Sequence, residues 1–485
     1  MIKSPVLDLM KSFNTEEFKR FLEFLQSPYF NKNSNLVKVA KYLKKLVPLN
    51  NHDKLSEEKI WNAVYGKKEF NYGIMKNLVY ELKKATERFL AVEHLEKNEL
   101  YKELFVIKEL NQRTLGEILE KKIVTSKNKI ENGKMNISKL YFLYRFNSID
   151  SVYKENLFSK ESEKLADDEE LSNSFINYFF ASIFYLNYNR LINSKMLNTE
   201  TDLKTVINFI EFYEKAFTGK NILSDLYYYA VKITLDPDNE ECYDTLKKLL
   251  FDNYEILDHS SVKDFAAILS AYCQLKKSGS KNNYVQEEFD NTCFFLDKGL
   301  FNAEHNSFFD SNLFSRLAEY SLVLNKPEWC RDFIDKYKDQ LSPLNREVRI
   351  GIAEIYLENH IGNYEHALEI LSKTKPEKVI EIFKIRSIEL IIFFNLKDYE
   401  RVYTLIKNFR SYIDYEEKVS ELVSKAYIDF LNYTRKLTDI LVNSNNAGEL
   451  KNDLEELYSN IQNKKIANKT WLKTAISNSL TEADR

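Results

Sequence analysis

The feature that most constrains this chain is an aromatic-marked turn that recurs every 35 residues. Gly362 is followed closely by Tyr364, which opens an amphipathic segment, and Trp329 and Tyr399 lie 35 residues to either side of that tyrosine. Glycine readily adopts the left-handed backbone of a tight turn, and a recurrence of this length is typical of helix–turn–helix repeats. The spacing therefore predicts antiparallel helix pairs stacked in series.

The best-matched segment, 349–376, resembles a tetratricopeptide repeat. Ile352–Tyr356 fits the Leu-Gly-x-x-Tyr of that repeat with Ala in place of Gly, and Ala367 is the small residue that lets a neighbouring helix approach. The match is incomplete, because Arg349 stands where the repeat has Trp and Val402 replaces the small residue in the next unit. We therefore expect a degenerate array.

Glycine and proline are too scarce for a turn-rich β or α/β fold. The 485 residues include 10 Gly and 7 Pro, about 2% and 1.4% of the chain against typical values of about 7% and 5%. Hydrophobic residues make up 44% and charged residues 29%, which excludes global disorder. The predicted fold class is all-α, with an N-terminal helical bundle followed by a degenerate tetratricopeptide-like α-solenoid.

Residues 1–96 are expected to form a separate helical domain. Asn14 caps an amphipathic helix that ends before Pro28, Ser56 caps a third helix, and a fourth starts near Asn71 and runs to about residue 96. Asn and Ser are favoured caps because their side chains accept hydrogen bonds from the first free backbone N–H groups.

The same N-terminal residues resemble a family of uncharacterised bacterial helical proteins. The resemblance rests on Phe13–Phe21, on the Ser-Pro-Tyr-Phe-Asn turn at Ser27–Asn31, and on Leu55–Trp61. It covers about the first 95 residues and implies tetratricopeptide-like helices downstream. The family has no assigned activity, so the resemblance implies no site residues.

Three regions are predicted after the first domain. Long helices connect over 97–169, with one helix expected from 97 to about Ile130, the repeats occupy 170–440, and capping helices close the stack over 441–485. The charge-rich residues 160–170 are interpreted as a solvated helix end or a linker. The expected helix pairs are 170–193 with 200–218, 221–235 with 238–251, 261–277 with 284–300, 308–324 with 327–340, 343–359 with 362–374, and 376–394 with 397–411.

Motifs for catalysis or cofactor binding are missing from the sequence. The six His are scattered, and the sequence has no H-E-x-x-H, no C-x-x-C, no glycine-rich phosphate loop and no nucleophile elbow. We therefore predict no enzyme activity, metal or cofactor. The four cysteines are expected to be buried free thiols in a reducing, cytoplasmic setting. They are Cys242, Cys273, Cys293 and Cys330.

A membrane role is not expected. The N-terminus lacks the apolar core of a signal peptide. Leu171–Asn189 carries no charge, but Ser and Asn interrupt it, which leaves too short an apolar span for the ~20 residues that a bilayer requires. We expect this segment to be a buried helix.

Two functional hypotheses follow. The first is a scaffold that binds a protein or peptide partner in a concave groove built by the first helices of successive pairs. Its groove candidates are Arg349, Tyr356, Arg386 and Phe393, for which the sequence does not distinguish groove from core.

The alternative is a regulator that binds nucleic acid through residues 1–96. The fourth helix of this domain bears Lys76, Lys83, Lys84 and Arg88, although a solvated helix face explains the same residues. The net charge of −3 and pI near 6.2 give no overall basic field for nucleic acid.

Overall fold

The computed structural model describes residues 5–46, 56–156, 161–197, 202–276, 284–301, 308–344, 346–376, 378–416, 419–444, 446–462 and 464–483. Every regular element in these ranges is a helix, which confirms that the fold is all-α. Contacts between residues divide the chain into two compact units, residues 1–228 and 229–485.

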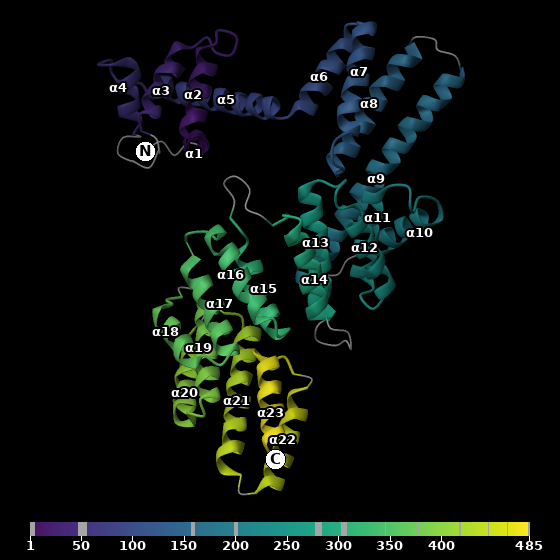
Figure 1. The fold of residues 1–485 in the computed structure, drawn as a ribbon. Helices are drawn as coiled ribbons and strands as arrows, with labels where there is room; N and C mark the ends of the chain where they lie inside the picture. Colours follow the sequence, from purple (N-terminus) through teal and green to yellow (C-terminus); the bar gives the residue numbers. More distant parts are fainter. Residues whose placement is uncertain are drawn as a thin grey trace. The chain divides into compact units, whose positions relative to one another are not determined.

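The first five helices of unit 1 lie together as a bundle (Figure 1). Its core is rich in aromatic residues. The side chain of Asn14 accepts from the Glu17 N–H at 2.9 Å and the Glu17 carboxylate accepts from the Asn14 N–H at 2.9 Å, so the predicted cap is a reciprocal capping box. Gly66 ends its helix at φ +67°. The helices are α1 (Pro5–Lys11), which was not predicted, α2 (Thr15–Gln26), α3 (Ser34–Lys44), α4 (Glu57–Tyr65) and α5 (Tyr72–Lys97).

The prediction of a single helix from residue 97 to Ile130 is wrong. The chain forms α6 (Glu99–Gln112) and α7 (Gly116–Glu131), with Thr114 between them in the left-handed region at φ 55°. Gly116 explains why the second helix starts where it does, because a Cβ there would lie 2.5 Å from the Tyr153 hydroxyl of α8 (Ile137–Asn156). The glycine permits close packing of α7 on α8.

The longest helix, α9 (Glu161–Leu197), contains most of the charge-rich segment and all of Leu171–Asn189. It packs along α8, and its Phe180 ring lies 4.8 Å from the Tyr213 ring of α10 (Lys204–Ala216). Both Phe180 and Tyr213 are buried. Among the described residues, the search for a helix with the length and apolar character to span a bilayer finds none.

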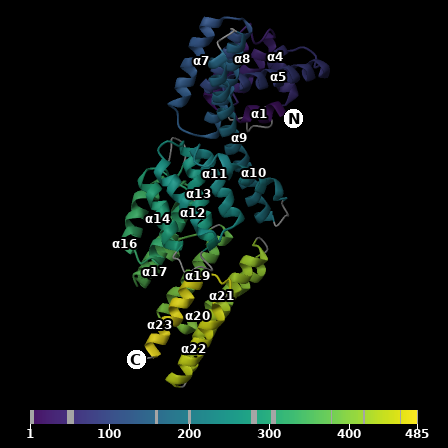
Figure 2. The same ribbon diagram turned by 90° about the vertical axis from the view of Figure 1, so that its right-hand side faces the viewer.

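Four of the predicted helix pairs are adjacent helices in unit 2: α13 with α14, α15 with α16, α17 with α18, and α19 with α20. The final helices α20 to α23 lie side by side in both views (Figure 1 and Figure 2). The bounds are α11 (Ile222–Leu235), which the unit boundary crosses, α12 (Glu240–Asn253), α13 (His259–Lys276), α14 (Tyr284–Asp297), α15 (Ser311–Val323), α16 (Pro327–Tyr337), the 3₁₀ turn η2 (Lys338–Gln340), α17 (Arg346–His360), α18 (Tyr364–Lys373), α19 (Val379–Asn395), α20 (Tyr399–Tyr415), α21 (Glu421–Asn443), α22 (Ala447–Ile461) and α23 (Lys469–Ala483).

Three successive turns of unit 2 share one geometry. Asn325, Gly362 and Lys397 have positive φ angles of 56°, 84° and 59°, respectively. In each turn the next residue donates its N–H to the carbonyl five residues earlier, at 2.8 to 3.0 Å, which is the bonding pattern of a left-handed helix end. Side chains also join successive turns, since His360 Nε2 lies 3.2 Å from Asn325 Oδ1.

The helix starts after these turns show that Trp329, Tyr364 and Tyr399 do not all occupy the same position in their helices, although the 35-residue spacing predicts that they do. Tyr364 and Tyr399 are the first residues of α18 and α20, but Trp329 is the third residue of α16, which begins at Pro327. Aligning the helix starts brings one buried position into register. The fourth residues of the three helices are Cys330, Ala367 and Val402, each 0% exposed.

Candidate binding site

The predicted groove residue Arg349 fills the interface between three first helices. Its Nη1 donates to Ser315 Oγ of α15 at 3.1 Å, and its Nη2 lies 3.1 Å from Glu381 Oε1 of α19. The Arg349 and Glu381 side chains are only 12% and 6% exposed. Glu381 Oε1 has no donor in hydrogen-bonding geometry, so the pair is held by charge attraction. Arg349 is therefore a structural clamp at a closed interface.

The other three candidates do not share one surface with Arg349. Tyr356 packs against two core clusters, and burial raises the pKa of its hydroxyl. The Arg386 guanidinium stacks 4.4 Å from the Tyr412 ring of α20, and the Arg401 guanidinium of α20 lies 5.0 Å from the Phe393 ring. Arg386 and Phe393 thus face the partner helix of their own pair.

A cavity of about 520 Å³ lies where α13, α14 and α15 meet. This volume falls within the roughly 300–1,000 Å³ typical of ligand pockets. The cavity arises locally, because three of the residues that α13 contributes, Ala266, Ala267 and Ser270, are too small to fill the space. The remaining lining residues are Lys263, Glu288, Asn291, Thr292, Phe295, Phe301, Phe308, Asp310, Asn312, Leu313 and Arg316.

Glu288 forms the polar wall of this cavity and is only 1% exposed. Its carboxylate accepts from Ser270 Oγ at 2.5 Å, from Gln274 Nε2 at 3.0 Å and from the Tyr320 hydroxyl at 2.9 Å. Arg316 Nε lies 3.4 Å away. A buried charge is tolerable only with such compensation, so Glu288 is committed to holding α13, α14 and α15 together.

Asn291 adds an unsatisfied acceptor to the cavity lining. Its Nδ2 donates to the Tyr243 hydroxyl at 2.9 Å, while its buried Oδ1 has no hydrogen-bond partner among the described residues. The Tyr243 hydroxyl in turn donates to Glu287 Oε1 at 3.0 Å, and Lys247 Nζ reaches the same oxygen at 2.6 Å. An unpaired buried acceptor in an otherwise satisfied network is costly.

The charge offered to a ligand comes from Lys263 and Arg316. Asp310 Oδ1 caps α15 by accepting the N–H groups of Asn312 and Leu313 at 2.8 and 2.7 Å, and Glu288 is committed as described. Arg316 is one-third exposed, and Lys263 is partly exposed. The cavity therefore combines apolar walls with two cations at its polar side.

A second, more acidic cavity of about 300 Å³ lies between α16, α17 and α18. His366 Nδ1 lies 3.3 Å from Glu358 Oε2, and burial raises the pKa of Glu354. Arg331 of α16 reaches Glu358 only at 3.9 Å. This site is smaller than the cavity beside α14, and its carboxylates outnumber its cations.

The four cysteines do not form disulfides. All four cysteines are free, and three are buried, which confirms the prediction for their pairing state. Burial raises the pKa of Cys273 and of Cys293 to about 12, so both thiols are protonated at neutral pH. Within the described ranges, no three His, Cys, Asp or Glu side chains gather as a metal site would require.

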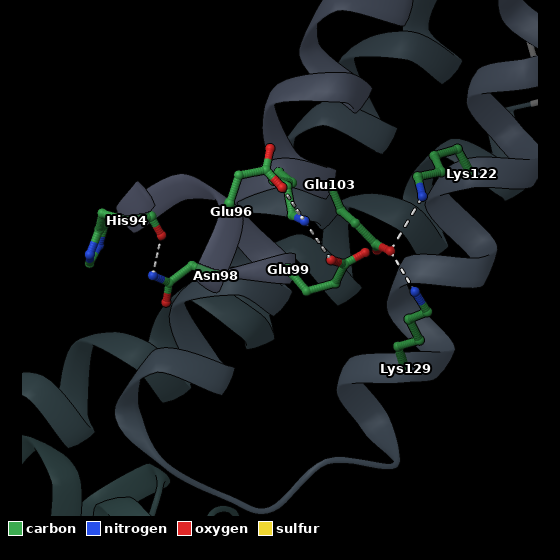
Figure 3. Close-up of polar contacts among 8 residues, drawn as sticks. His94, Glu96, Asn98, Glu99, Glu103, Lys122 and Lys129 are labelled. Carbon is green, nitrogen blue, oxygen red and sulfur yellow. Dashed lines mark hydrogen bonds and ion pairs between the residues drawn. The ribbon is translucent and has the colours of Figure 1, made fainter. Parts of the chain in front are cut away.

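In unit 1 a charged cluster around the buried Glu103 is structural. Glu103 of α6 is buried, and Lys122 and Lys129 of α7 reach its Oε1 at 3.3 and 2.7 Å (Figure 3). Burial would raise the pKa of Glu103, but the hydrogen bonds from the lysines outweigh it and hold the pKa below its usual range. The cluster fixes α6 on α7.

The candidate cavity was not identified by sequence reasoning. Glu288, Asn291 and Thr292 are polar residues at helical spacing on the buried side of α14, and that pattern could have indicated it. Comparison of the chain with protein-family models, with curated proteins and with solved structures finds no match.

Proposed function

We propose that this protein is a non-enzymatic helical scaffold that binds a segment of a partner protein. In this proposal unit 2 is a degenerate tetratricopeptide-like α-solenoid. The shared turn geometry at Asn325, Gly362 and Lys397 supports it, as does the 3.2 Å bond from Asn395 Nδ2 to Asn359 Oδ1, which joins the C-terminal ends of α19 and α17. Repeats of this kind typically bind extended segments of other proteins.

The cavity between α13, α14 and α15 carries the proposal and revises the predicted groove. An apolar side chain of the partner enters between Phe295 and Leu313, where full burial of a large apolar side chain is worth about 1.5–3 kcal/mol. An acidic residue beside it pairs with Lys263 and Arg316. Both cations line the cavity, so the two contacts are made together.

An enzymatic role has less support at this cavity. A general acid or base must be able to exchange a proton with its substrate. The Glu288 carboxylate is instead surrounded by Ser270, Gln274, Tyr320 and Arg316. Its environment is suited to fixing helices rather than to proton transfer.

Site-specific photo-crosslinking in cells of the source organism tests the proposal. A benzophenone amino acid replaces Ala267, which is exposed and lines the cavity, and in the control it replaces Asp244, an exposed residue of α12. We expect one protein to crosslink from position 267 and not from position 244. The crosslinked peptide should contain an apolar residue next to an acidic residue.

A Lys263→Gln/Arg316→Gln variant should remove that crosslink while helix content remains unchanged by circular dichroism. Equal crosslinking from positions 267 and 244, or a product that survives loss of both cations, would contradict the proposal. Copurification of a small molecule in the cavity would also contradict it.

A further inference from the structure

The exposed face of α5 carries a ridge in which tyrosines and cations alternate. Tyr72, Lys76, Tyr80, Lys84 and Arg88 follow one another at four-residue spacing, and each is exposed. Helix geometry places successive members roughly 6 Å apart along the axis, so the ridge extends over roughly 24 Å. The opposite face of α5 packs into the core of the bundle through Met75, Leu78, Leu82 and Phe89.

The aromatic rings of this surface are open to solvent and are flanked by cations. Tyr29, Tyr72 and Tyr80 are 78%, 65% and 56% exposed. Lys84 Nζ lies 4.6 Å from the centroid of the Tyr80 ring. The Arg88 guanidinium lies 5.9 Å from the Tyr29 ring, so the Ser-Pro-Tyr-Phe-Asn turn places a third exposed ring at the end of the ridge. Cation–π attraction helps to hold these rings in place.

The carboxylates on the same helix face have partners of their own. Glu81 Oε2 accepts from Asn33 Nδ2 at 2.6 Å, and Glu87 pairs with Lys83 at 3.5 Å. Lys83 offsets the charge of Glu87, and the three cations Lys76, Lys84 and Arg88 outweigh the single charge of Glu81, so the ridge is positive. Residues 1–97 contain eighteen Lys and Arg against twelve Asp and Glu, a net charge of +6, whereas the rest of the chain carries −9.

We propose that the ridge, Tyr29 together with the five α5 residues, binds single-stranded nucleic acid. Bases stack on the exposed tyrosine rings while phosphates pair with the intervening cations, as on other single-strand platforms. A duplex fits less well, because its base faces are already stacked and cannot reach the rings. Tyrosine stacking and phosphate pairing read no base edge, so sequence preference is weak.

Fluorescence anisotropy with the full-length chain and labelled dT20 tests this proposal. Binding should be measurable at 50 mM NaCl and should weaken with salt, with a slope of log affinity on log salt of about −2 for three phosphate contacts. Tyr72→Ser/Tyr80→Ser should weaken binding roughly tenfold or more. Lys76→Gln/Lys84→Gln should weaken it and reduce the slope to about −0.7.

The matched control is Lys38→Gln/Lys41→Gln, which removes the same charge from exposed residues of α3 and should leave the affinity within twofold. The proposal is overturned if dT20 does not bind at 50 mM NaCl, or if the tyrosine variant binds like the wild type. It is also overturned if the control weakens binding as much as Lys76→Gln/Lys84→Gln does. Preference for a 20-base-pair duplex, or binding to phosphatidylserine vesicles in place of dT20, would assign the ridge to another partner.

Discussion

Two neighbouring interfaces of unit 2 each contain an Arg–Glu ion pair. One pair is largely buried, whereas the other lies beside a cavity. At the interface of α15, α17 and α19, Arg349 pairs with Glu381 and both side chains are largely buried. At the meeting point of α13, α14 and α15, Arg316 lies beside Glu288, and a cavity of about 520 Å³ remains next to them.

Helix α15 contributes to both interfaces through adjacent residues. Ser315 accepts from Arg349 on one side, and Arg316 reaches Glu288 on the other. The difference arises from side-chain size, because Ala266 and Ala267 leave space on α13 while α19 is lined with large apolar residues. A buried charged pair in unit 2 is therefore structural where its surroundings are packed. It is available to a ligand where they are not.

The largest expected effect on stability comes from loss of the Arg349–Glu381 pair. Arg349→Ala leaves Glu381 buried without its cation, which should cost about 3–5 kcal/mol. Hydrogen exchange monitored by mass spectrometry should report this as a lower opening free energy for the amides of α17 and α19. Replacing both partners, as Arg349→Met with Glu381→Leu, should restore most of the protection. A cost below about 1 kcal/mol for the single change would show that the pair is not a clamp.

Lowering the pH should destabilise the contact between α12 and α14. Burial would raise the pKa of Glu287, but hydrogen bonds from Lys247 and Tyr243 outweigh it and hold that pKa below its usual range. A lowered folded-state pKa gives stability that is present above the unfolded pKa of about 4.3 and is lost as the pH falls through the folded value. Hydrogen exchange of α12 and α14 should accelerate over that window.

The Glu287→Gln variant is the control for this acid effect. It should cost about 1–3 kcal/mol at neutral pH, because Lys247 loses its charged acceptor. The acid dependence of α12 and α14 should then become flatter. An unchanged profile would mean that another carboxylate controls it.

Loss of the Arg316–Glu288 pair should cost less stability than loss of the Arg349–Glu381 pair. Arg316 is one-third exposed, so Arg316→Met should destabilise α14 and α15 by only about 1 kcal/mol. Under the proposed function it should nevertheless weaken partner binding, since Arg316 faces the cavity. Equal stability losses for Arg316→Met and Arg349→Ala, measured by the same exchange experiment, would remove the distinction between the two interfaces.

Filling the open cavity should have the smallest effect on stability. Ala266→Leu adds apolar volume where space exists, so we expect a change within about 0.5 kcal/mol and a loss of partner binding. The same enlargement at a closed position, Ala367→Leu at a site with 0% exposure, should cost about 1–3 kcal/mol from overpacking. Thermal unfolding of the two variants compares them directly.

The helices were largely predictable from the sequence because their signals are local. Caps such as Asn14 and turns such as Gly362 depend on neighbouring residues, so the helix that follows Asn14 and four helix pairs of unit 2 were predicted correctly. The break at Thr114 was missed because a threonine at φ 55° gives no sequence signal of its own. Only the following Gly116 could have indicated it.

The site was less predictable because it depends on contacts between distant residues. Arg349 lies on a first helix as expected, but nothing in the sequence reveals that Ser315 and Glu381 surround it. The cavity likewise results from Ala266 meeting Phe295 across two helices. Spacing along one helix identifies its faces, whereas the distinction between groove and core requires the neighbouring helix.

Thiol protection at the cavity tests the central claim most directly. The native cysteines provide a low background, since Cys273 and Cys293 have a pKa of about 12 and react slowly as protonated thiols. An Ala267→Cys variant should react rapidly with a maleimide when the chain is alone. It should be protected when the protein crosslinked from position 267 is added, whereas Asp244→Cys should react equally in both states. Equal labelling of Ala267→Cys with and without that protein would contradict a docking site between α13, α14 and α15.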